Sequence, residues 1–366
     1  MFEVRNRKST VLYLLMLIIQ ILTACTNVNA DDIDKPTLEE DNTKISVLDK
    51  NGAPITGDYI VRLYNDIKDN KQETSSEIKT TIDLNLQQEV AKEIDKIPNM
   101  VKYSFVIMNP YNGEIIAISE NSEDTYIPSS TFKGISSAIF LDTHIIEKDT
   151  IVDSSPYSIG NTTVRSLLPL NKEEISFEEA LIKKCNPVFA RLASETGKEN
   201  FFSYLNEFGI KIPDNKSDFT DEELALYSIG QVEVTPMEMA LAYSVLANGG
   251  NSVQPELILQ LDSSELDKSE KSVISAKTSE QMKELLHKCN AQNKNSNSDI
   301  AGIYGISSDQ DSNIISCNFA GISSLESNSQ FCLVVSISTS EASQSITEQL
   351  STAVNNIMDI IINNNI

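Results

Sequence analysis

Tyr103-Ser104-Phe105-Val106-Ile107-Met108 is an apolar run rich in the residue types that favour β-strands, and Glu114-Ile115-Ile116-Ala117-Ile118-Ser119 is a second one. The stretch between them, Pro110-Tyr111-Asn112-Gly113, has the composition of a turn. Two such runs joined by a short turn predict a β-hairpin. The chain therefore contains an antiparallel sheet.

The segments on either side of this hairpin extend the pattern. Residues 84–94 carry apolar side chains at helical spacing, and residues 313–320 and 331–338 predict two more strands. Residues 345–362 predict a closing helix, and the region from about 130 to 290 is mainly helical in pattern. Strands near both ends with helices between them predict one α+β domain. Its expected architecture is an antiparallel sheet flanked by helices, with a mainly helical subdomain.

Composition excludes several classes of function. The 366 residues are 40% hydrophobic and 22% charged, which is sufficient for a packed core. Lys and Arg number 29 against 53 Asp and Glu, a net charge of −24, and a surface this acidic repels nucleic acid. With only His144 and His287, the chain lacks the ligands of a multi-His metal site. We expect no metal and no organic cofactor, since the chemistry that the residues below suggest requires neither.

The N-terminus predicts an export signal. Three basic residues among the first eight precede the apolar run of residues 11–24, an order typical of a secretory signal peptide. As a helix this run rises roughly 21 Å, less than the roughly 30 Å hydrocarbon core of a bilayer. Leu22-Thr23-Ala24-Cys25 looks like a bacterial lipobox, so we expect a signal peptide over residues 1–24 and a lipid on Cys25. The alternative is an uncleaved signal anchor. Either way the remaining chain is expected outside the cytoplasm, on the outer face of the bacterial cell membrane.

The stretch after Cys25 has the composition of a tether. It contains acidic pairs such as Asp31-Asp32 and a polar stretch over residues 68–76, with little that packs. Residues 45–49 predict one short strand, followed by a turn. We therefore expect an extracytoplasmic linker over residues 25–76 and a domain over residues 77–366.

Ser130 and Lys133 are the candidates for chemistry. They stand in Pro128-Ser129-Ser130-Thr131-Phe132-Lys133, ahead of an apolar helix predicted at residues 135–141. Side chains three residues apart lie on one face of a helix. A buried Lys has a lowered pKa and can take the proton of a Ser hydroxyl, and the helix N-terminus offers N–H groups to an oxyanion. Taken alone, the same residues also fit an N-cap Ser beside a solvated Lys.

Several motifs, in order along residues 79–366, resemble the transpeptidase domain of penicillin-binding proteins, the serine acyltransferases that cross-link bacterial peptidoglycan. Besides the Ser130 motif, which has Ser129 where Gly is usual, the matching segments are Thr80-Thr81-Ile82-Asp83, Asn109-Pro110, Gly113-Glu114-Ile115-Ile116-Ala117, Ile229-Gly230-Gln231, Thr235-Pro236-Met237 and Ala247-Asn248-Gly249-Gly250. The resemblance implies the penicillin-binding protein and β-lactamase-like fold. It also implies Ser130 as nucleophile and Lys133 as general base.

The family's second motif, Ser-x-Asn, falls on Lys184-Cys185-Asn186. The resemblance implies that Asn186 is catalytic, with its amide available to the substrate's peptide carbonyl and to Lys133. Lys184 stands where the family has serine, and a cation there would lower the pKa of Lys133. We expect Lys184, or alternatively Lys183, to supply a substrate-binding cation.

The third motif, Lys-Thr/Ser-Gly, falls on Ile303-Tyr304-Gly305. The family uses this Lys and nearby hydroxyl groups to hold the substrate's terminal carboxylate, and Ile303 offers neither charge nor donor. We expect Tyr304, Gly305 and Ile306 to contact substrate, with the Ile306 backbone N–H as an oxyanion donor.

Two stretches carry similar letters elsewhere. Lys277-Thr278-Ser279 resembles the third motif but introduces a predicted helix, and Ser316-Cys317-Asn318 resembles the second motif but lies in a predicted strand. Neither is expected to be functional.

Three functions follow from these residues. The first is a membrane-tethered D,D-transpeptidase-like protein of peptidoglycan synthesis, which forms a serine acyl-enzyme with D-Ala-D-Ala stem peptides or β-lactams, with altered or impaired activity. The second is an inactive homologue that binds wall peptides or partner proteins. The third and least favoured is a β-lactamase or β-lactam sensor, for which the sequence shows no obvious hydrolytic base. The expected partners are stem peptides or β-lactams, the membrane through lipid on Cys25, and cell-wall synthesis proteins.

Overall fold

The computed structural model forms two compact units, Met1–Lys44 and Ile45–Ile366. It describes residues 39–40, 43–44, 46–55, 77–119, 121–167, 170, 172–212, 219–259, 271–293, 299–308, 315–323, 330–340 and 346–364. In the first unit, β1 (Glu39–Glu40) pairs antiparallel with β2 (Thr43–Lys44). The predicted signal peptide and Cys25 lie outside the described residues. Within the described part of the chain, no helix is long and apolar enough to cross a bilayer.

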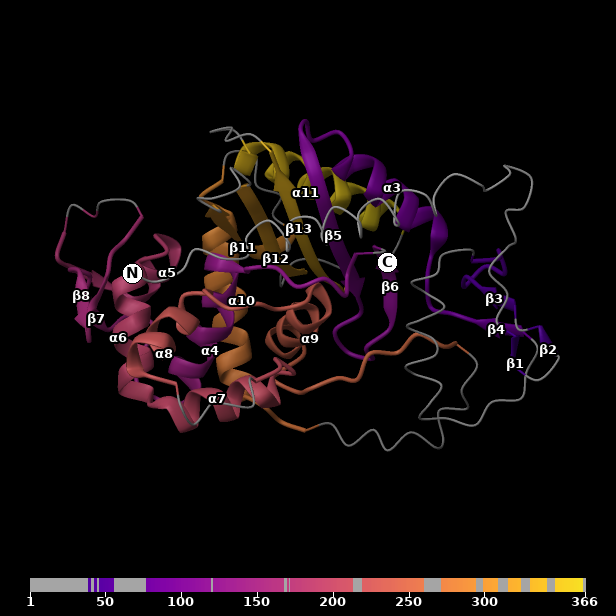
Figure 1. Cartoon of the computed structure of the whole chain (residues 1–366). Coiled ribbons are helices and arrows are strands. Elements are labelled where there is room, and N and C mark those ends of the chain that lie inside the picture. Colours follow the sequence, from indigo (N-terminus) through magenta and orange to yellow (C-terminus); the bar gives the residue numbers. More distant parts are fainter. Residues whose placement is uncertain are drawn as a thin grey trace, which may run out of the picture. The chain divides into compact units, whose positions relative to one another are not determined.

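A five-stranded antiparallel sheet forms the centre of the second unit (Figure 1). Its strands are, in spatial order, β11 (Ile300–Ser308), β12 (Ile315–Ser323), β13 (Cys332–Thr339), β5 (Met100–Met108) and β6 (Ile115–Ile118). The hairpin predicted from residues 103–119 is the β5–β6 pair, in which Val106 faces Ile118. The predicted α+β class is confirmed.

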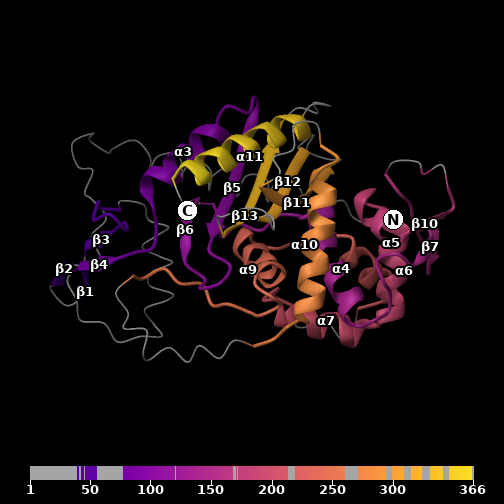
Figure 2. The same ribbon diagram turned by 180° about the vertical axis from the view of Figure 1, so that it is seen from behind.

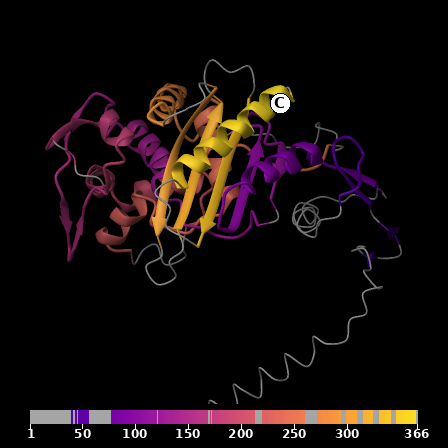
Figure 3. The same ribbon diagram turned by 90° about the horizontal axis from the view of Figure 1, so that it is seen from above.

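Two helices cover one face of this sheet. They are α3 (Leu84–Ile94) and α11 (Ile346–Asn363), and Figure 2 shows them side by side above the strands. Seen from above in Figure 3, α11 lies across the strands. The Asp83 side chain accepts a hydrogen bond from the backbone N–H of Leu86 (3.0 Å) and so fixes the start of α3. Both helices bury apolar stripes, including Val90 and Ile357, against the sheet.

The opposite face packs against helices that carry the candidate chemistry. They are α4 (Lys133–Asp142), α9 (Pro236–Ala247) and α10 (Ala276–Asn290). A short 3₁₀ turn, η1 (Ser129–Phe132), leads directly into α4. Because α4 is buried along nearly its whole length, the turn before it is fixed by the core.

The subdomain beside α4 is mainly helical, as predicted. It contains α5 (Phe177–Ile182), α6 (Asn186–Thr196), α7 (Lys198–Glu207) and α8 (Asp221–Ser228). It also contains two small strand pairs that the sequence did not predict. These are β7 (Ile151–Asp153) with β10 (Glu174–Ser176), and β8 (Tyr157–Ile159) with β9 (Thr162–Val164).

The strand predicted at residues 45–49 is β3 (Ser46–Leu48), and it pairs in parallel with β4 (Glu77–Lys79). The Lys50 ammonium, just beyond β3, forms an ion pair with Asp83 at 2.8 Å. Both strands belong to the second unit, Ile45–Ile366.

Candidate active site

The structure brings Ser130 and Lys133 together in a buried position at the start of α4. Ser130 is 6% exposed and Lys133 is 1% exposed. Lys133 Nζ donates a hydrogen bond to Ser130 Oγ at 3.3 Å and another to the backbone carbonyl of Ile229 at 3.4 Å. At this distance a neutral lysine amine is able to take the proton of the serine hydroxyl.

Burial changes the basicity of Lys133. The pKa of Lys133 is lowered to about 7, mainly by desolvation and in second place by the positive charge of Lys184. The ammonium also lies over the Phe189 ring, 5.6 Å from its centroid. Near neutral pH a large share of Lys133 is therefore a neutral amine that accepts a proton.

The residue before Ser130 has an unusual backbone conformation. Ser129 has φ 53°, in the left-handed region that favours Gly. Its N–H donates to the carbonyl of Gly230 at 3.1 Å, and a Cβ on Gly230 would collide with the Ser129 backbone. The Ser129 hydroxyl is buried and has no hydrogen-bond partner in the described part of the chain. The turn before Ser130 therefore requires the backbones of Ser129 and Gly230 to lie in close contact.

Gly305 is a second point of close contact with this turn. A Cβ on Gly305 would lie 2.6 Å from the Pro128 carbonyl oxygen and 2.9 Å from the Ser130 nitrogen. Gly305 belongs to β11, the strand at one edge of the sheet. The absence of a side chain on Gly305 lets this edge strand touch the turn that carries Ser130.

The other residues predicted on β11 point in two directions. Ile303 is buried in the cluster that contains Phe132, whereas Tyr304 is buried in the opposite cluster, with its ring 4.6 Å from that of Phe319. Side chains alternate along a strand, so Tyr304 lies on the face away from the turn. We therefore correct Tyr304 from a substrate contact to a core residue. Ile306 is 43% exposed beyond Gly305.

The residues predicted for the second motif lie at the junction of α5 and α6. Lys184 has φ 55°, is half-buried, and has a pKa lowered by burial. Its charge acts on Lys133, on Cys289 of α10 and on Cys317 of β12. Asn186 is the first residue of α6, and its amide donates to the Arg165 carbonyl at 3.3 Å. Among the described residues, this amide forms no hydrogen bond with Lys133.

Asn318 was not predicted as a site residue, because it belongs to Ser316-Cys317-Asn318, a stretch that was not expected to be functional. Asn318 is fully buried in β12, and its amide donates to the Ile127 carbonyl, three residues before Ser130, at 2.8 Å. The sequence signal that could have identified Asn318 is its amide in the middle of a predicted strand that is otherwise largely apolar. The other misleading stretch, at residues 277–279, forms the first turn of α10, where Thr278 bonds Asp142.

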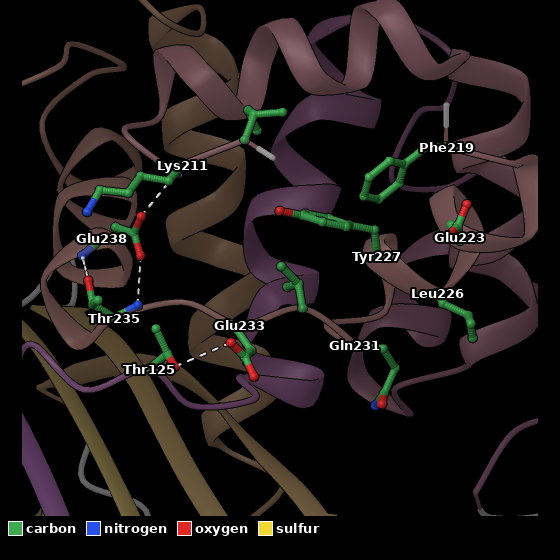
Figure 4. Close-up of a pocket in the computed structure, with 12 residues that line it drawn as sticks. Thr125, Lys211, Phe219, Glu223, Leu226, Tyr227, Gln231, Glu233, Thr235 and Glu238 are labelled. Atoms are coloured by element: carbon green, nitrogen blue, oxygen red, sulfur yellow. Dashed lines mark hydrogen bonds between the residues drawn. The ribbon is translucent and has the colours of Figure 1, made fainter. Parts of the chain in front are cut away.

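Two cavities lie near the turn without including Ser130 or Lys133 among their lining residues. One, of about 560 Å³, lies against α8 and is lined by apolar Phe219 and Tyr227 and by polar Gln231 and Glu233 (Figure 4). The other, of about 430 Å³, shares Gln231 and Glu233 and has hydroxyl-bearing residues of the sheet on its floor, among them Ser307. Within the described residues, no group of His, Cys, Asp and Glu side chains suits a metal ion.

Comparison with known proteins gives a consistent result. A family model described as the penicillin binding protein transpeptidase domain matches residues 103–359. Stage V sporulation protein D of Bacillus subtilis is 26% identical over 302 residues, which cover 66% of this chain and 46% of that protein. The peptidoglycan D,D-transpeptidase PbpA of Mycobacterium tuberculosis is 30% identical over 168 residues, 41% of this chain and 33% of that protein. The chain thus spans less than half the length of these curated relatives.

Solved structures show the same fold. The D,D-transpeptidase domain of a peptidoglycan glycosyltransferase from Eggerthella lenta has a TM-score of 0.68 at 17% identity, covering 86% of this chain and 98% of that one. The transpeptidase domain of penicillin-binding protein 3 from Burkholderia pseudomallei has a TM-score of 0.66 at 15% identity, covering 78% and 96%.

Proposed function

Because the chain belongs to the family of penicillin-binding protein transpeptidase domains, we propose that it is a serine D,D-transpeptidase of peptidoglycan synthesis that forms an acyl-enzyme through Ser130. The observation that carries this proposal is the buried Ser130–Lys133 pair, with 3.3 Å between Oγ and Nζ. Stem peptides that end in D-Ala-D-Ala are the proposed substrates, and β-lactams are the proposed inhibitors.

In this mechanism, Lys133 acts as a neutral amine. It takes the proton of Ser130 Oγ as the Oγ–carbon bond forms at the carbonyl of the penultimate D-Ala. The proton then passes to the nitrogen of the terminal D-Ala as the carbon–nitrogen bond breaks, which leaves an ester on Ser130. The amine of a second stem peptide attacks this ester, forms a new amide, and returns a proton to Ser130 Oγ as the carbon–Oγ bond breaks.

We assign the oxyanion to two backbone donors, the N–H groups of Ser130 and Ile306. Support for this assignment is the close contact of Gly305 with the Ser130 nitrogen, which brings both chain segments to one point. Such donors are already oriented before the reaction, and each typically contributes a factor of about 10²–10³ to the rate.

Lys184 is the cation that we assign to the terminal carboxylate of the substrate. Ile303 brings no charge to the strand position where the family has Lys, whereas Lys184 brings an ammonium from the α5–α6 junction. Its charge acts on Lys133, and among the described residues Lys184 forms no ion pair with a carboxylate. A half-buried ammonium without a carboxylate partner attracts an anionic group, because opposite charges interact more strongly where water is partly excluded. Asn186 remains the proposed contact for the substrate's peptide carbonyl.

A second candidate function is wall-peptide binding without turnover. The observation that favours it is the apolar Ile303 in the third motif. An acyl-enzyme assay separates the two candidates, because binding alone forms no covalent bond.

The test is to incubate the full chain with a fluorescent penicillin and to map the adduct by mass spectrometry. A covalent adduct on Ser130 that is absent from Ser130→Ala is the expected result. Thr131→Ser is the matched control, since it changes a neighbouring hydroxyl residue and leaves Ser130 in place. If no adduct forms at saturating probe, the enzymatic proposal is rejected and the binding candidate stands.

We propose that the protein is held outside the cytoplasm by a lipid on Cys25. The supporting observation is the lipobox-like Leu22-Thr23-Ala24-Cys25 after a short apolar run. Metabolic labelling with a fatty acid is expected to mark the wild-type chain and not Cys25→Ala. Equal labelling of both chains excludes this anchor.

A further inference from the structure

Asn318 is an amide in a place where strands normally carry apolar side chains. It lies in the middle of β12 and is 0% exposed. Burying an amide without partners is costly, so the partners of a buried Asn indicate its role. Here Nδ2 donates to the Ile127 carbonyl at 2.8 Å, and Oδ1 accepts from Ser336 Oγ, also at 2.8 Å.

Both hydrogen bonds have good lengths, and each involves a different part of the fold. Ser336 is 5% exposed on β13, where it stands directly opposite Asn318. Ile127 immediately precedes Pro128 and the η1 turn. The amide of Asn318 is therefore held by the sheet on one side and holds the nucleophile turn on the other.

The register of the sheet places Asn318 opposite Gly305. Directly opposed residues of antiparallel strands have their side chains on the same face, so Asn318 extends on the face where Gly305 meets the turn. The missing side chain of Gly305 admits the turn, and the amide of Asn318 bonds its first carbonyl. Gly305 and Asn318 together therefore form the part of the sheet against which the turn packs.

The other hydrogen bonds of the turn lead elsewhere. Tyr243 of α9 donates to the Thr131 carbonyl at 2.6 Å, and Ser129 donates to Gly230 at 3.1 Å. Within the described chain, one side-chain hydrogen bond connects residues 127–131 to the sheet. It is the bond from Asn318 to the Ile127 carbonyl. This connection matters for chemistry because the two proposed oxyanion donors lie on opposite sides of it, Ser130 on the turn and Ile306 on the sheet.

We infer that Asn318, oriented by Ser336, is a positioning residue for Ser130 that fixes the nucleophile turn relative to the edge strand β11. The inference rests on the proposed acyl-enzyme function and adds a residue to it that contacts no reacting atom. Misplacing a catalytic group by about 1 Å can cost about 10²-fold in rate. Loss of the bond should therefore reduce the rate of acylation more than the binding of the acylating compound.

Asn318→Leu tests this inference, because Leu has a similar volume and no amide. Its matched control is Asn290→Leu. Asn290 is 1% exposed, and its Nδ2 donates to the Ile300 carbonyl at 3.0 Å, far along β11 from Gly305. Stopped-flow labelling is carried out at increasing concentrations of fluorescent penicillin. It gives separately the limiting acylation rate and the dissociation constant of the complex that forms before acylation. The labelling signal is normalised to the number of sites labelled at the end of the reaction. Ser336→Ala is a milder second variant that keeps the amide of Asn318.

The expected result is a roughly 10- to 100-fold lower limiting acylation rate for Asn318→Leu, with a dissociation constant within about threefold of wild type. Ser336→Ala should show a smaller loss, and Asn290→Leu should acylate like wild type even where its melting temperature falls. A wild-type limiting rate in Asn318→Leu overturns the inference.

Hydrogen–deuterium exchange gives a readout that does not need activity. In Asn318→Leu, exchange is expected to rise in the peptide that covers residues 124–134, and in Asn290→Leu it is not. Unchanged exchange of this peptide in Asn318→Leu overturns the inference. If the wild-type chain fails to acylate, the proposed function falls, and the exchange data still decide whether Asn318 positions the turn.

Discussion

At the scale of single residues, Ser129 holds a backbone conformation that its own side chain disfavours. A non-Gly residue in the left-handed region costs about 1–2 kcal/mol, and a buried hydroxyl without a partner costs about 1–3 kcal/mol. The position adopts φ 53° because the turn must present Ser130 while Ser129 bonds Gly230. The chain has Ser at position 129, although Gly would adopt this backbone conformation with less strain.

We predict that Ser129→Gly raises the free energy of unfolding by about 1 kcal/mol. The relief of strain and the removal of the unpaired hydroxyl exceed the roughly 0.5–1 kcal/mol of extra chain entropy that Gly brings to the unfolded state. Urea denaturation measures the change. Asn99→Gly is the control, because Asn99 also has positive φ (57°) but Asn tolerates this region, so its stability should change by only a few tenths of a kcal/mol. A lower stability of Ser129→Gly contradicts the account.

The basicity of Lys133 predicts how acylation depends on pH. Burial lowers its pKa to about 7, so the neutral amine that accepts the Ser130 proton is lost as the pH falls below 7. The acylation rate should therefore rise with pH around a midpoint near 7. In Lys184→Met the midpoint should move upward, because the charge of Lys184 contributes to the lowering.

Rates of penicillin labelling between pH 5 and 9 measure both midpoints. Lys183→Met is the matched control, since Lys183 is paired with Glu179 at 2.6 Å and does not contribute to the pKa of Lys133. A midpoint in Lys184→Met at or below the wild-type value contradicts the predicted repulsion.

At the scale of elements, the contact between β11 and η1 determines whether the site can form. We predict that Gly305→Ala lowers the acylation rate about 10²-fold, because its Cβ would lie 2.6 Å from the Pro128 oxygen and would push the turn off the strand. Gly302→Ala on the same strand is the control. Its Cβ would meet the Phe319 ring instead, so it should lower stability and leave the rate per labelled site unchanged. Equal rate losses in both variants would show that β11 acts on the site only through general stability.

Elements with a strong pattern could be predicted from the sequence. The helix predicted at residues 84–94 is α3, and the strands predicted at 313–320 and 331–338 are β12 and β13 with ends shifted by one to three residues. The three-residue strands β7 to β10 were missed because so short a segment contains no measurable period.

Residues whose role depends on register could not be predicted. Ser130 and Lys133 are close in sequence, so helical spacing alone suggested their contact. The burial of Tyr304 on the far face, and the meeting of Asn318 with Ile127, depend on how β11 and β12 align and on what covers each face. Strand alignment and the packing on each face depend on residues that are far apart in the sequence. For this reason the Tyr304 side chain was expected to face the substrate, whereas it lies on the opposite face of the sheet.

At the scale of the whole molecule, the net charge of −24 is a source of self-repulsion. Salt screens this repulsion, with a Debye length of about 10 Å at 0.1 M. We predict that raising sodium chloride from about 20 to 300 mM raises the melting temperature by a few degrees, measured by differential scanning fluorimetry. Potassium chloride at equal ionic strength should give the same shift, because screening does not depend on the identity of the cation. A fall in melting temperature contradicts the prediction.

The position of β11 at the edge of the sheet has one more consequence. Among the described strands β11 pairs with β12 alone, and residues 300–305 of this edge strand are buried, whereas Ile306 is exposed. Backbone groups near Ile306 are therefore in a position to pair with an extended peptide. Many proteins protect such an edge with lysines, prolines or bulges. The described residues of β11 include neither lysine nor proline, and the exposed part of the strand presents Ile306. The acidic composition offers a different protection, because the net charge of −24 makes copies of the chain repel one another at long range before their edges can pair.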